Sequence, residues 1–293
     1  MAFLFYFERM AHICLNGKLL DADNPVLVAS NRSYRYGDGL FETMRVLNGR
    51  ILLPGLHFER LFSSLQTLQF EIPSHISKDL FETEIIKLCR KNKCTDCARV
   101  RLSVSRGEGG LYDGDNKFHY LIECWPLDET VSKLNGPDSY RDGLLIDIYP
   151  DALKSIDKFS NLKSASHLPY VMAAQWAKEN KLNDALVLNS YERVADSTIA
   201  NVFWINNGII FTPPLSEGCI AGVIRRYLLE NLRLSGFTVK EQMLYTTDLE
   251  DVDEVFLTNA IRGIRWVKQF RDKKYSNLLS SEIYHKLVRT IWE

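Results

Sequence analysis

The chain has 293 residues, of which 46% are apolar and 25% charged, and its formal net charge is −1. This balance is typical of a globular protein with a generous core. The sequence has no basic stripe that would indicate a nucleic-acid partner, and no acidic tail that would indicate a charged macromolecule as partner. A small anionic ligand must therefore be bound by local groups.

Residues 1–9 are apolar at first but too short for a membrane span, and we expect an irregular extension there. We predict a cytoplasmic protein with no membrane partner. The six cysteines form no disulfide framework, which favours a reducing compartment. Cys94 and Cys97 form a single CxxC, which favours an ordinary loop over a zinc or redox site, and we expect no metal.

Strands and helices alternate through the first half of the chain. Asn16-Gly17 and Asn48-Gly49 each separate two apolar runs, which is a strong sequence signal for a β-hairpin. Two further segments have apolar residues at helical spacing. The expected strands are His12–Leu15, Lys18–Leu20, Leu40–Leu47, Arg50–Leu53, Ala98–Val104 and His119–Cys124, and the expected helices are Leu56–Leu68 and Leu80–Lys91.

A polar stretch containing Asn-Gly-Pro predicts a linker at residues 131–142. It would separate an N-terminal α+β domain (1–130) from a C-terminal α/β domain (143–293). In the second domain the expected strands are Leu144–Tyr149, Ala185–Asn189, Asn201–Ile205, Ile209–Thr212, Val239–Met243 and Val255–Thr258, and the expected helices are Leu168–Glu179, Val223–Ser235 and Ser280–Trp292.

Three features of the second domain together indicate a covalently held, phosphate-bearing cofactor. Lys163 lies among small and apolar residues, where an amine can act as a nucleophile. Asp196 follows a strand, and a carboxylate there could keep a pyridine nitrogen protonated. Gly222 precedes Val223 and Ile224 at the start of a helix, where backbone N–H groups suit a phosphate.

Each of these residues alone has an ordinary explanation, as a surface lysine, a turn aspartate and a glycine before a helix. Arg60 is a candidate second phosphate ligand because guanidinium binds phosphate bidentately, although an isolated helix arginine is usually solvated. The combination in this order favours pyridoxal phosphate.

From Ile13 to Val267 the chain resembles the class IV aminotransferases, which have pyridoxal-phosphate fold type IV. This family includes branched-chain aminotransferase, D-amino acid aminotransferase and aminodeoxychorismate lyase. The matching segments are Tyr34–Thr43, His57–Leu61, Val104–Gly107, Lys163, Asn201–Phe203 with Thr212, Gly222–Arg225 and Leu257–Ala260.

The resemblance implies a two-domain α/β enzyme of the D-amino acid aminotransferase-like fold, with the cofactor in the interdomain cleft and a homodimeric assembly. Lys163 would hold the cofactor and later move the Cα proton. The cofactor-binding residues would be Arg60, Lys163, His167, Asp196, Gly222, Val223, Ile224, Thr258 and Asn259, and the substrate-binding residues Tyr34, Glu42, Arg45, Arg106, Asn259 and Ala260.

The chain departs from the family pattern at three of these positions. The acid facing the ring nitrogen is usually Glu, whereas here it is Asp196, with Glu192 as a weaker candidate in a turn that carries an extra residue. His167 stands where many relatives carry a Tyr that hydrogen-bonds the cofactor's phenolic oxygen. Ile224 replaces the usual Thr, which removes a hydroxyl but keeps the backbone N–H.

The motifs indicate the family more clearly than they indicate which reaction the enzyme catalyses. Glu42 after Phe41 is typical of the transaminases, whereas Asn259-Ala260 and the glycine-rich run after Arg106 resemble the lyase. We predict an aminotransferase acting on an amino acid and a 2-oxo acid, with 4-amino-4-deoxychorismate lyase as the alternative. A non-catalytic pyridoxal-phosphate protein is a third hypothesis, which Asp196 and Ile224 motivate.

Overall fold

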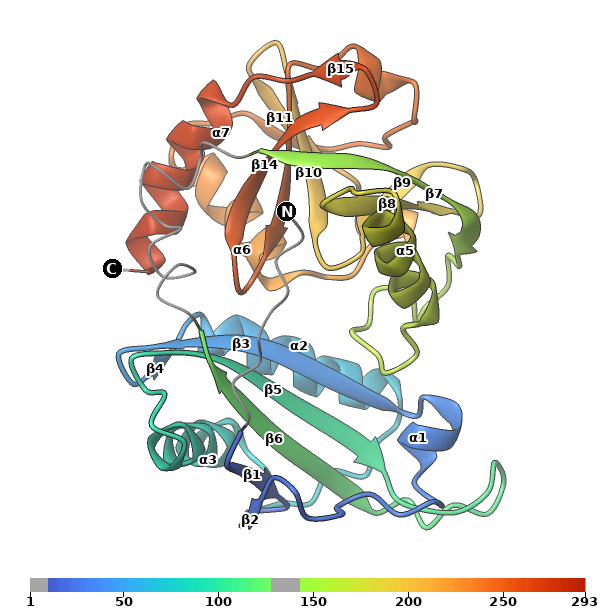
Figure 1. Ribbon diagram of the computed structural model, residues 1–293, viewed down its shortest axis with the longest axis vertical. Coiled ribbons are helices and arrows are strands. Elements are labelled where there is room, and N and C mark those ends of the chain that lie inside the picture. The colour runs from blue at the N-terminus through green and yellow to red at the C-terminus, as the bar shows by residue number, and fades with distance from the viewer. Residues whose placement is uncertain (1–9, 128–142, 293) are drawn as a thin grey trace. The chain divides into compact units, whose positions relative to one another are not determined.

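The computed structural model describes residues 10–127 and 143–292, and these form two compact units (Figure 1). One unit contains residues 10–127 and 163–167, and the other contains 143–162 and 168–292. Residues 163–167 therefore belong with the N-terminal sheet, although the expected boundary at residue 143 placed them in the second domain. The expected extension at residues 1–9 and the expected linker at 131–142 lie outside the described residues.

The N-terminal unit is built on a six-stranded antiparallel sheet in the order β2-β1-β6-β5-β3-β4. Helices α2 and α3 pack against it, α2 on β3 and α3 on β1 and β6 (Figure 1). Its elements are β1 His12–Leu15, β2 Lys18–Asp21, α1 Arg32–Tyr36, β3 Gly39–Leu47, β4 Arg50–Ile51, α2 Pro54–Thr67, α3 Lys78–Lys91, β5 Cys97–Arg106 and β6 Phe118–Pro126.

Both expected hairpins form, and their turns have the backbone that Asn-Gly favours. Asn16 and Gly17 have φ of 47° and 82°, and Asn48 and Gly49 have 50° and 72°, as a two-residue turn with left-handed residues requires. The strand after the second turn is shorter than expected. Leu53 turns to a left-handed φ of 52° and becomes the N-cap of α2, whose first residue is Pro54.

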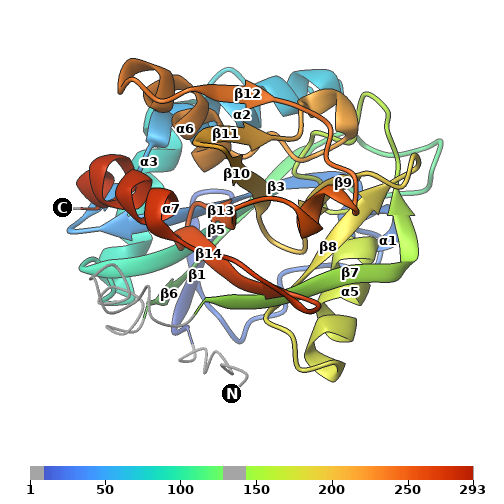
Figure 2. The same ribbon diagram turned by 90° about the horizontal axis from the view of Figure 1, so that it is seen from above.

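The second unit contains a nine-stranded mixed sheet among its described residues. The path runs β12-β11-β10-β13-β14-β7-β8-β9, with β15 paired to β14. Helix α5 packs on β7 and β8, and α6 packs on β12 and β13 (Figure 1, Figure 2). Its strands are β7 Leu144–Lys154, β8 Asp184–Asn189, β9 Val194–Ser197, β10 Asn201–Asn206, β11 Ile209–Thr212, β12 Val239–Glu241, β13 Glu254–Asn259, β14 Gly263–Phe270 and β15 Lys273–Lys274. Its α-helices are α5 Leu168–Glu179, α6 Val223–Leu234 and α7 Leu278–Ile283.

Strand β7 is longer than expected, β12 is shorter, and β14, β15 and the C-terminal helix differ most from expectation. Strand β14 was not expected, because GIRWVKQF mixes charged residues into its apolar alternation and gives no clear strand signal. It pairs antiparallel with β13 and parallel with β7. The expected closing helix at Ser280–Trp292 is an α-helix only to Ile283. The chain then continues as a π-helix at Tyr284–Val288 and a 3₁₀-helix at Arg289–Ile291.

The core of the sheet lies where β7, β8, β9, β10, β13 and β14 carry their aliphatic and aromatic side chains. Burying these apolar surfaces is the main favourable contribution to folding, at about 25 cal/mol per Å². Its fully buried members include Leu186, Val194, Val202, Val255 and Val267. Among the described residues no helix is both long and apolar enough to cross a bilayer.

Candidate active site

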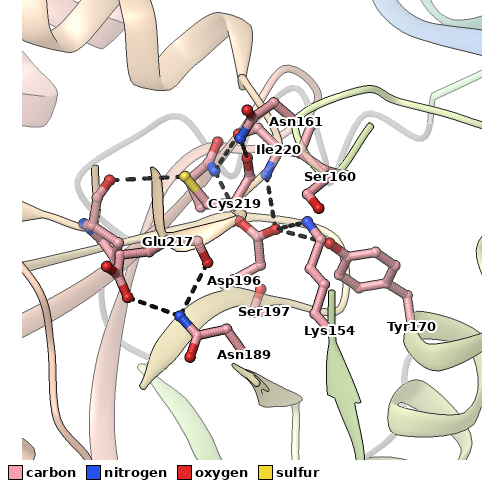
Figure 3. Close-up of polar contacts among 12 residues, drawn as sticks. Lys154, Ser160, Asn161, Tyr170, Asn189, Asp196, Ser197, Glu217, Cys219 and Ile220 are labelled. Carbon is pink, nitrogen blue, oxygen red and sulfur yellow. Dashed lines mark hydrogen bonds and ion pairs between the residues drawn. The ribbon is translucent and has the colours of Figure 1, made fainter. Parts of the chain in front are cut away.

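Asp196 lies at the centre of a buried hydrogen-bond network in the second unit (Figure 3). Its Oδ2 accepts from Lys154 Nζ at 3.0 Å, from the Tyr170 hydroxyl at 2.8 Å and from the Ile220 N–H at 2.9 Å. Its Oδ1 accepts from Asn201 Nδ2 at 3.0 Å. The side chain is 3% exposed, so these donors replace water around the carboxylate.

Lys154 and Tyr170 are the partners that sequence reasoning missed. Lys154 ends β7, and Tyr170 lies in the first turn of α5. A register shift between Ile148 and Leu153 in the β7–β8 ladder sets the face on which Lys154 lies. Burial and the charge of Asp196 raise the pKa of Tyr170 well above its usual value, so the phenol stays protonated and donates.

Asn201 connects the acid to the start of α6. Its amide nitrogen donates to Asp196 and also to the Ile220 carbonyl at 2.8 Å. Gly222, the N-cap of α6, approaches Asn201 so closely that a Cβ at position 222 would lie 1.8 Å from Asn201 Oδ1. A glycine is therefore required where the chain enters the helix. The close approach brings the start of α6 beside the residue that holds Asp196.

The N-terminus of α6 has properties that suit an anion. None of the described side chains caps it, and the first N–H groups of an α-helix have no acceptor within the helix. Asn201 on β10 pairs with Thr258 on β13. Thr258 is 2% exposed, and its Oγ1 has no hydrogen-bond partner among the described residues. A buried hydroxyl without a partner costs free energy unless a ligand satisfies it.

Asn259 and Ala260 follow Thr258 at the end of β13. The Asn259 side chain accepts from the N–H groups of Ile261 at 3.0 Å and Arg262 at 2.8 Å, which fixes the turn into β14. Ala260 lies in that turn and is half-buried. Glu192, the weaker candidate for the ring-nitrogen acid, lies exposed in the β8–β9 turn with φ of 57°.

In the N-terminal unit the backbone at Lys163 pairs with the first residues of β3. Its carbonyl accepts from the Phe41 N–H at 2.9 Å, and the next residue forms a bridge with Leu40. Lys163 Nζ lies 4.5 Å from the centroid of the Phe41 ring, and His167 meets the same ring edge-on at 5.3 Å. The amine is therefore placed over an aromatic face by a backbone that is itself held in the sheet.

Glu42 follows Phe41 and forms hydrogen bonds with two basic residues of α2, His57 and Arg60. Its carboxylate accepts from Arg60 Nε at 2.8 Å and Nη2 at 2.6 Å, and from His57 Nδ1 at 2.7 Å. Burial opposes ionisation, but the charge of Arg60 and the bonds from both bases lower the pKa of Glu42 to about 2. Burial also lowers the pKa of His57, so the ring is neutral at neutral pH and donates Nδ1–H.

This network makes Glu42 a source of acid sensitivity. Because its folded pKa lies below the ordinary 4.5, the carboxylate stabilises the fold above that pH, and the contribution is lost as pH falls toward about 2. Between pH 5 and 2 we expect the free energy of unfolding to fall faster in the wild type than in Glu42→Gln, by up to about 1.4 kcal/mol per pH unit. Denaturant titrations across this range measure the slopes. Glu59→Gln, an exposed change on the same helix, is the control and should keep the wild-type slope. Equal slopes in Glu42→Gln and wild type would contradict this assignment.

The other expected substrate residues of this unit are placed as follows. Tyr34 is 76% exposed on α1. Arg45 is buried on β3 and donates to Cys97 Sγ at 3.4 Å. Arg106, at the end of β5, donates to the Leu68 carbonyl at 2.5 Å and lies 3.5 Å from Asp38. The guanidinium groups of Arg45 and Arg106 thus make contacts within their own unit.

The chain is similar to known proteins over most of its length. Residues 39–270 match the family model described as amino-transferase class IV. The chain is 28% identical to a putative branched-chain-amino-acid aminotransferase of Methanocaldococcus jannaschii, over 96% of this chain and 97% of that one. It is also 28% identical to an aminodeoxychorismate lyase of Vibrio harveyi, over 80% and 83%. A PLP-bound hypothetical aminotransferase from Mycobacterium tuberculosis has the same fold, with a TM-score of 0.82 at 20% identity over 96% of this chain and 98% of that one.

Proposed function

This chain belongs to the class IV aminotransferases, a family of enzymes that use pyridoxal 5′-phosphate, and we propose that it transfers an amino group between an amino acid and a 2-oxo acid. The observation that carries the proposal is the similarity to the Methanocaldococcus jannaschii aminotransferase, which extends over almost the full length of both chains. We also propose that the enzyme is a cytoplasmic homodimer, as the sequence predicted.

The residues described in the second unit fit this cofactor. The open N-terminus of α6 and the Thr258 hydroxyl would bind its phosphate, and Asp196 would face its ring nitrogen. When bound, the cofactor supplies an electron sink for the substrate Cα. Lys154, Tyr170 and Asn201 would hold the Asp196 carboxylate in place. The rigid network would offset the shorter reach of aspartate.

In the N-terminal unit Lys163 would bind the cofactor covalently and then carry a proton between its Nζ and the substrate Cα. The Phe41 ring would restrict where that amine can lie. Arg60 would bind the phosphate with a guanidinium that Glu42 orients. The neutral His57 ring adds no second positive charge and donates to the Glu42 carboxylate from the same face of α2 as Arg60.

Thr258 gives a prediction that separates binding from folding. Thr258→Val removes a hydroxyl that has no partner among the described residues, so the apoprotein should keep its Tm. The dissociation constant for pyridoxal 5′-phosphate should rise about 10-fold or more, because a hydrogen bond to a charged group contributes about 1.5–3 kcal/mol. Equilibrium titration of apoprotein with the cofactor and thermal unfolding of the apoprotein measure both.

Thr212→Val is the matched control. Its Oγ1 donates to the Val202 carbonyl at 2.8 Å in the same sheet, so this change should lower the Tm and leave cofactor affinity near the wild-type value. A lowered Tm in Thr258→Val with unchanged cofactor affinity would contradict the phosphate role.

The alternative reaction is release of pyruvate and 4-aminobenzoate from 4-amino-4-deoxychorismate, as the similarity to the Vibrio harveyi lyase suggests. Purified holoenzyme should be incubated with that substrate in one assay, and with a panel of L- and D-amino acids plus 2-oxoglutarate in another. The proposal predicts turnover in the second assay. Robust pyruvate release in the first assay, with no amino-group transfer in the second, would overturn it.

A further inference from the structure

Two cysteines that are five residues apart, Cys89 and Cys94, form a compact sulfur cluster with Cys124 in the N-terminal unit. The Sγ atoms of Cys89, Cys94 and Cys124 all lie within 4.8 Å of one another, and Cys94 Sγ lies 3.6 Å from Cys124 Sγ. All three side chains are buried. Cys97, the other cysteine of the CxxC, lies outside this group, and its Sγ accepts from Arg45 Nη2. The CxxC motif therefore contributes only Cys94 to the cluster.

Ordered secondary structure holds the three sulfurs in place. Cys89 lies in α3, Cys124 lies on β6, and α3 packs on β6. Cys94 follows the helix, and its N–H donates to the Cys89 carbonyl at 3.0 Å. The helix C-cap Asn92 donates from Nδ2 to Cys124 Sγ at 3.1 Å and to the His12 carbonyl at 2.8 Å. The ligand atoms are thus positioned before any ion arrives.

Metal binding at cysteine displaces the thiol proton, so each of the three sulfurs can become a thiolate ligand when an ion binds.

We propose that Cys89, Cys94 and Cys124 form a binding site for one copper(I) ion. Thiolates select soft cations such as Cu(I), Zn(II) and iron–sulfur clusters. Structural zinc almost always takes four ligands, whereas the His, Cys, Asp and Glu side chains of the described residues place only these three ligand atoms together. A d¹⁰ monovalent ion that accepts three sulfurs matches this set. Its binding releases thiol protons to solvent and oxidises nothing.

The site makes a prediction about stability as well as stoichiometry. Cu(I) would link α3, the following loop and β6, and an ion that binds only the folded state stabilises it in proportion to its occupancy. Holoenzyme should be titrated anaerobically with Cu(I) in the presence of a chromophoric Cu(I) chelator and a non-thiol reductant. We expect one Cu(I) per chain, a raised Tm and an X-ray absorption spectrum with sulfur neighbours only.

Single Cys→Ser changes at positions 89, 94 and 124 should each weaken Cu(I) binding by more than about 100-fold, because each removes a direct ligand. Cys97→Ser is the matched control and should bind as the wild type does. Folding of each variant is checked by cofactor content and circular dichroism. Cys→Ala changes at the same positions provide a second set where serine disturbs packing.

Three outcomes would overturn the proposal. Wild-type protein that fails to compete with the chelator has no site. Loss of binding in Cys97→Ser, with binding retained in Cys124→Ser, would assign the ion to the CxxC. Binding of Zn(II) in preference to Cu(I), with a fourth ligand in its absorption spectrum, would show that the chosen ion is wrong.

Discussion

Replacing Lys163 with alanine is expected to lower kcat by at least about 10³-fold and to abolish borohydride-stable attachment of the cofactor, because the same amine binds the cofactor and moves the proton. The backbone around residue 163 is held by the Phe41 N–H and by pairing with Leu40, neither of which needs the side chain. The Tm of the apoprotein should therefore change little. Steady-state kinetics and mass spectrometry of the reduced protein measure the effect.

Lys158→Ala provides the comparison, since Lys158 is an exposed lysine of the neighbouring loop. It should keep wild-type kcat and wild-type cofactor attachment. A Lys163→Ala protein that still forms the covalent adduct would show that another amine is the attachment point. Lys154 would then be the first alternative attachment point to test, because it is buried in the other unit.

The Asp196→Asn variant is expected to lose about 3–5 kcal/mol of stability, because the Lys154 ammonium would remain buried without its counter-charge. The asparagine amide would also present N–H donors toward groups that themselves donate, namely Tyr170 and the Ile220 N–H. Activity should fall as well, since a neutral side chain no longer favours a protonated ring nitrogen. Urea unfolding and steady-state kinetics measure the two losses separately.

The double variant Asp196→Asn/Lys154→Met separates the structural role from the catalytic one. Removing the unpaired charge should restore most of the lost stability, as replacement of a buried ion pair by apolar groups often does. Activity should stay low, because the acid is still missing. Recovery of activity together with stability would mean that Asp196 only balances Lys154 and does not act on the cofactor.

Local signals in the sequence predicted the elements whose boundaries depend on nearby residues. Strand Ile209–Thr212 and helix Leu168–Glu179 have the expected bounds, and both Asn-Gly hairpins form. The family, the fold class and the cofactor were also predicted correctly. The motifs and their order along the chain were sufficient for these conclusions.

Contacts between distant segments could not be predicted in the same way. Lys154 reaches Asp196 only because β7 changes register against β8, and no residue pattern specifies that shift. The cysteine cluster depends on how α3 packs on β6, whereas the sequence offered only the CxxC spacing. The expected residue roles themselves remain predictions, and the variants above test them one at a time.

The lysine that binds the cofactor is identified directly by reducing the wild-type holoenzyme with borohydride, digesting it and locating the modified peptide by mass spectrometry. We expect a single pyridoxyl adduct, on Lys163. An adduct on Lys154 or on any other lysine, or a reduced protein that carries no adduct, would contradict it.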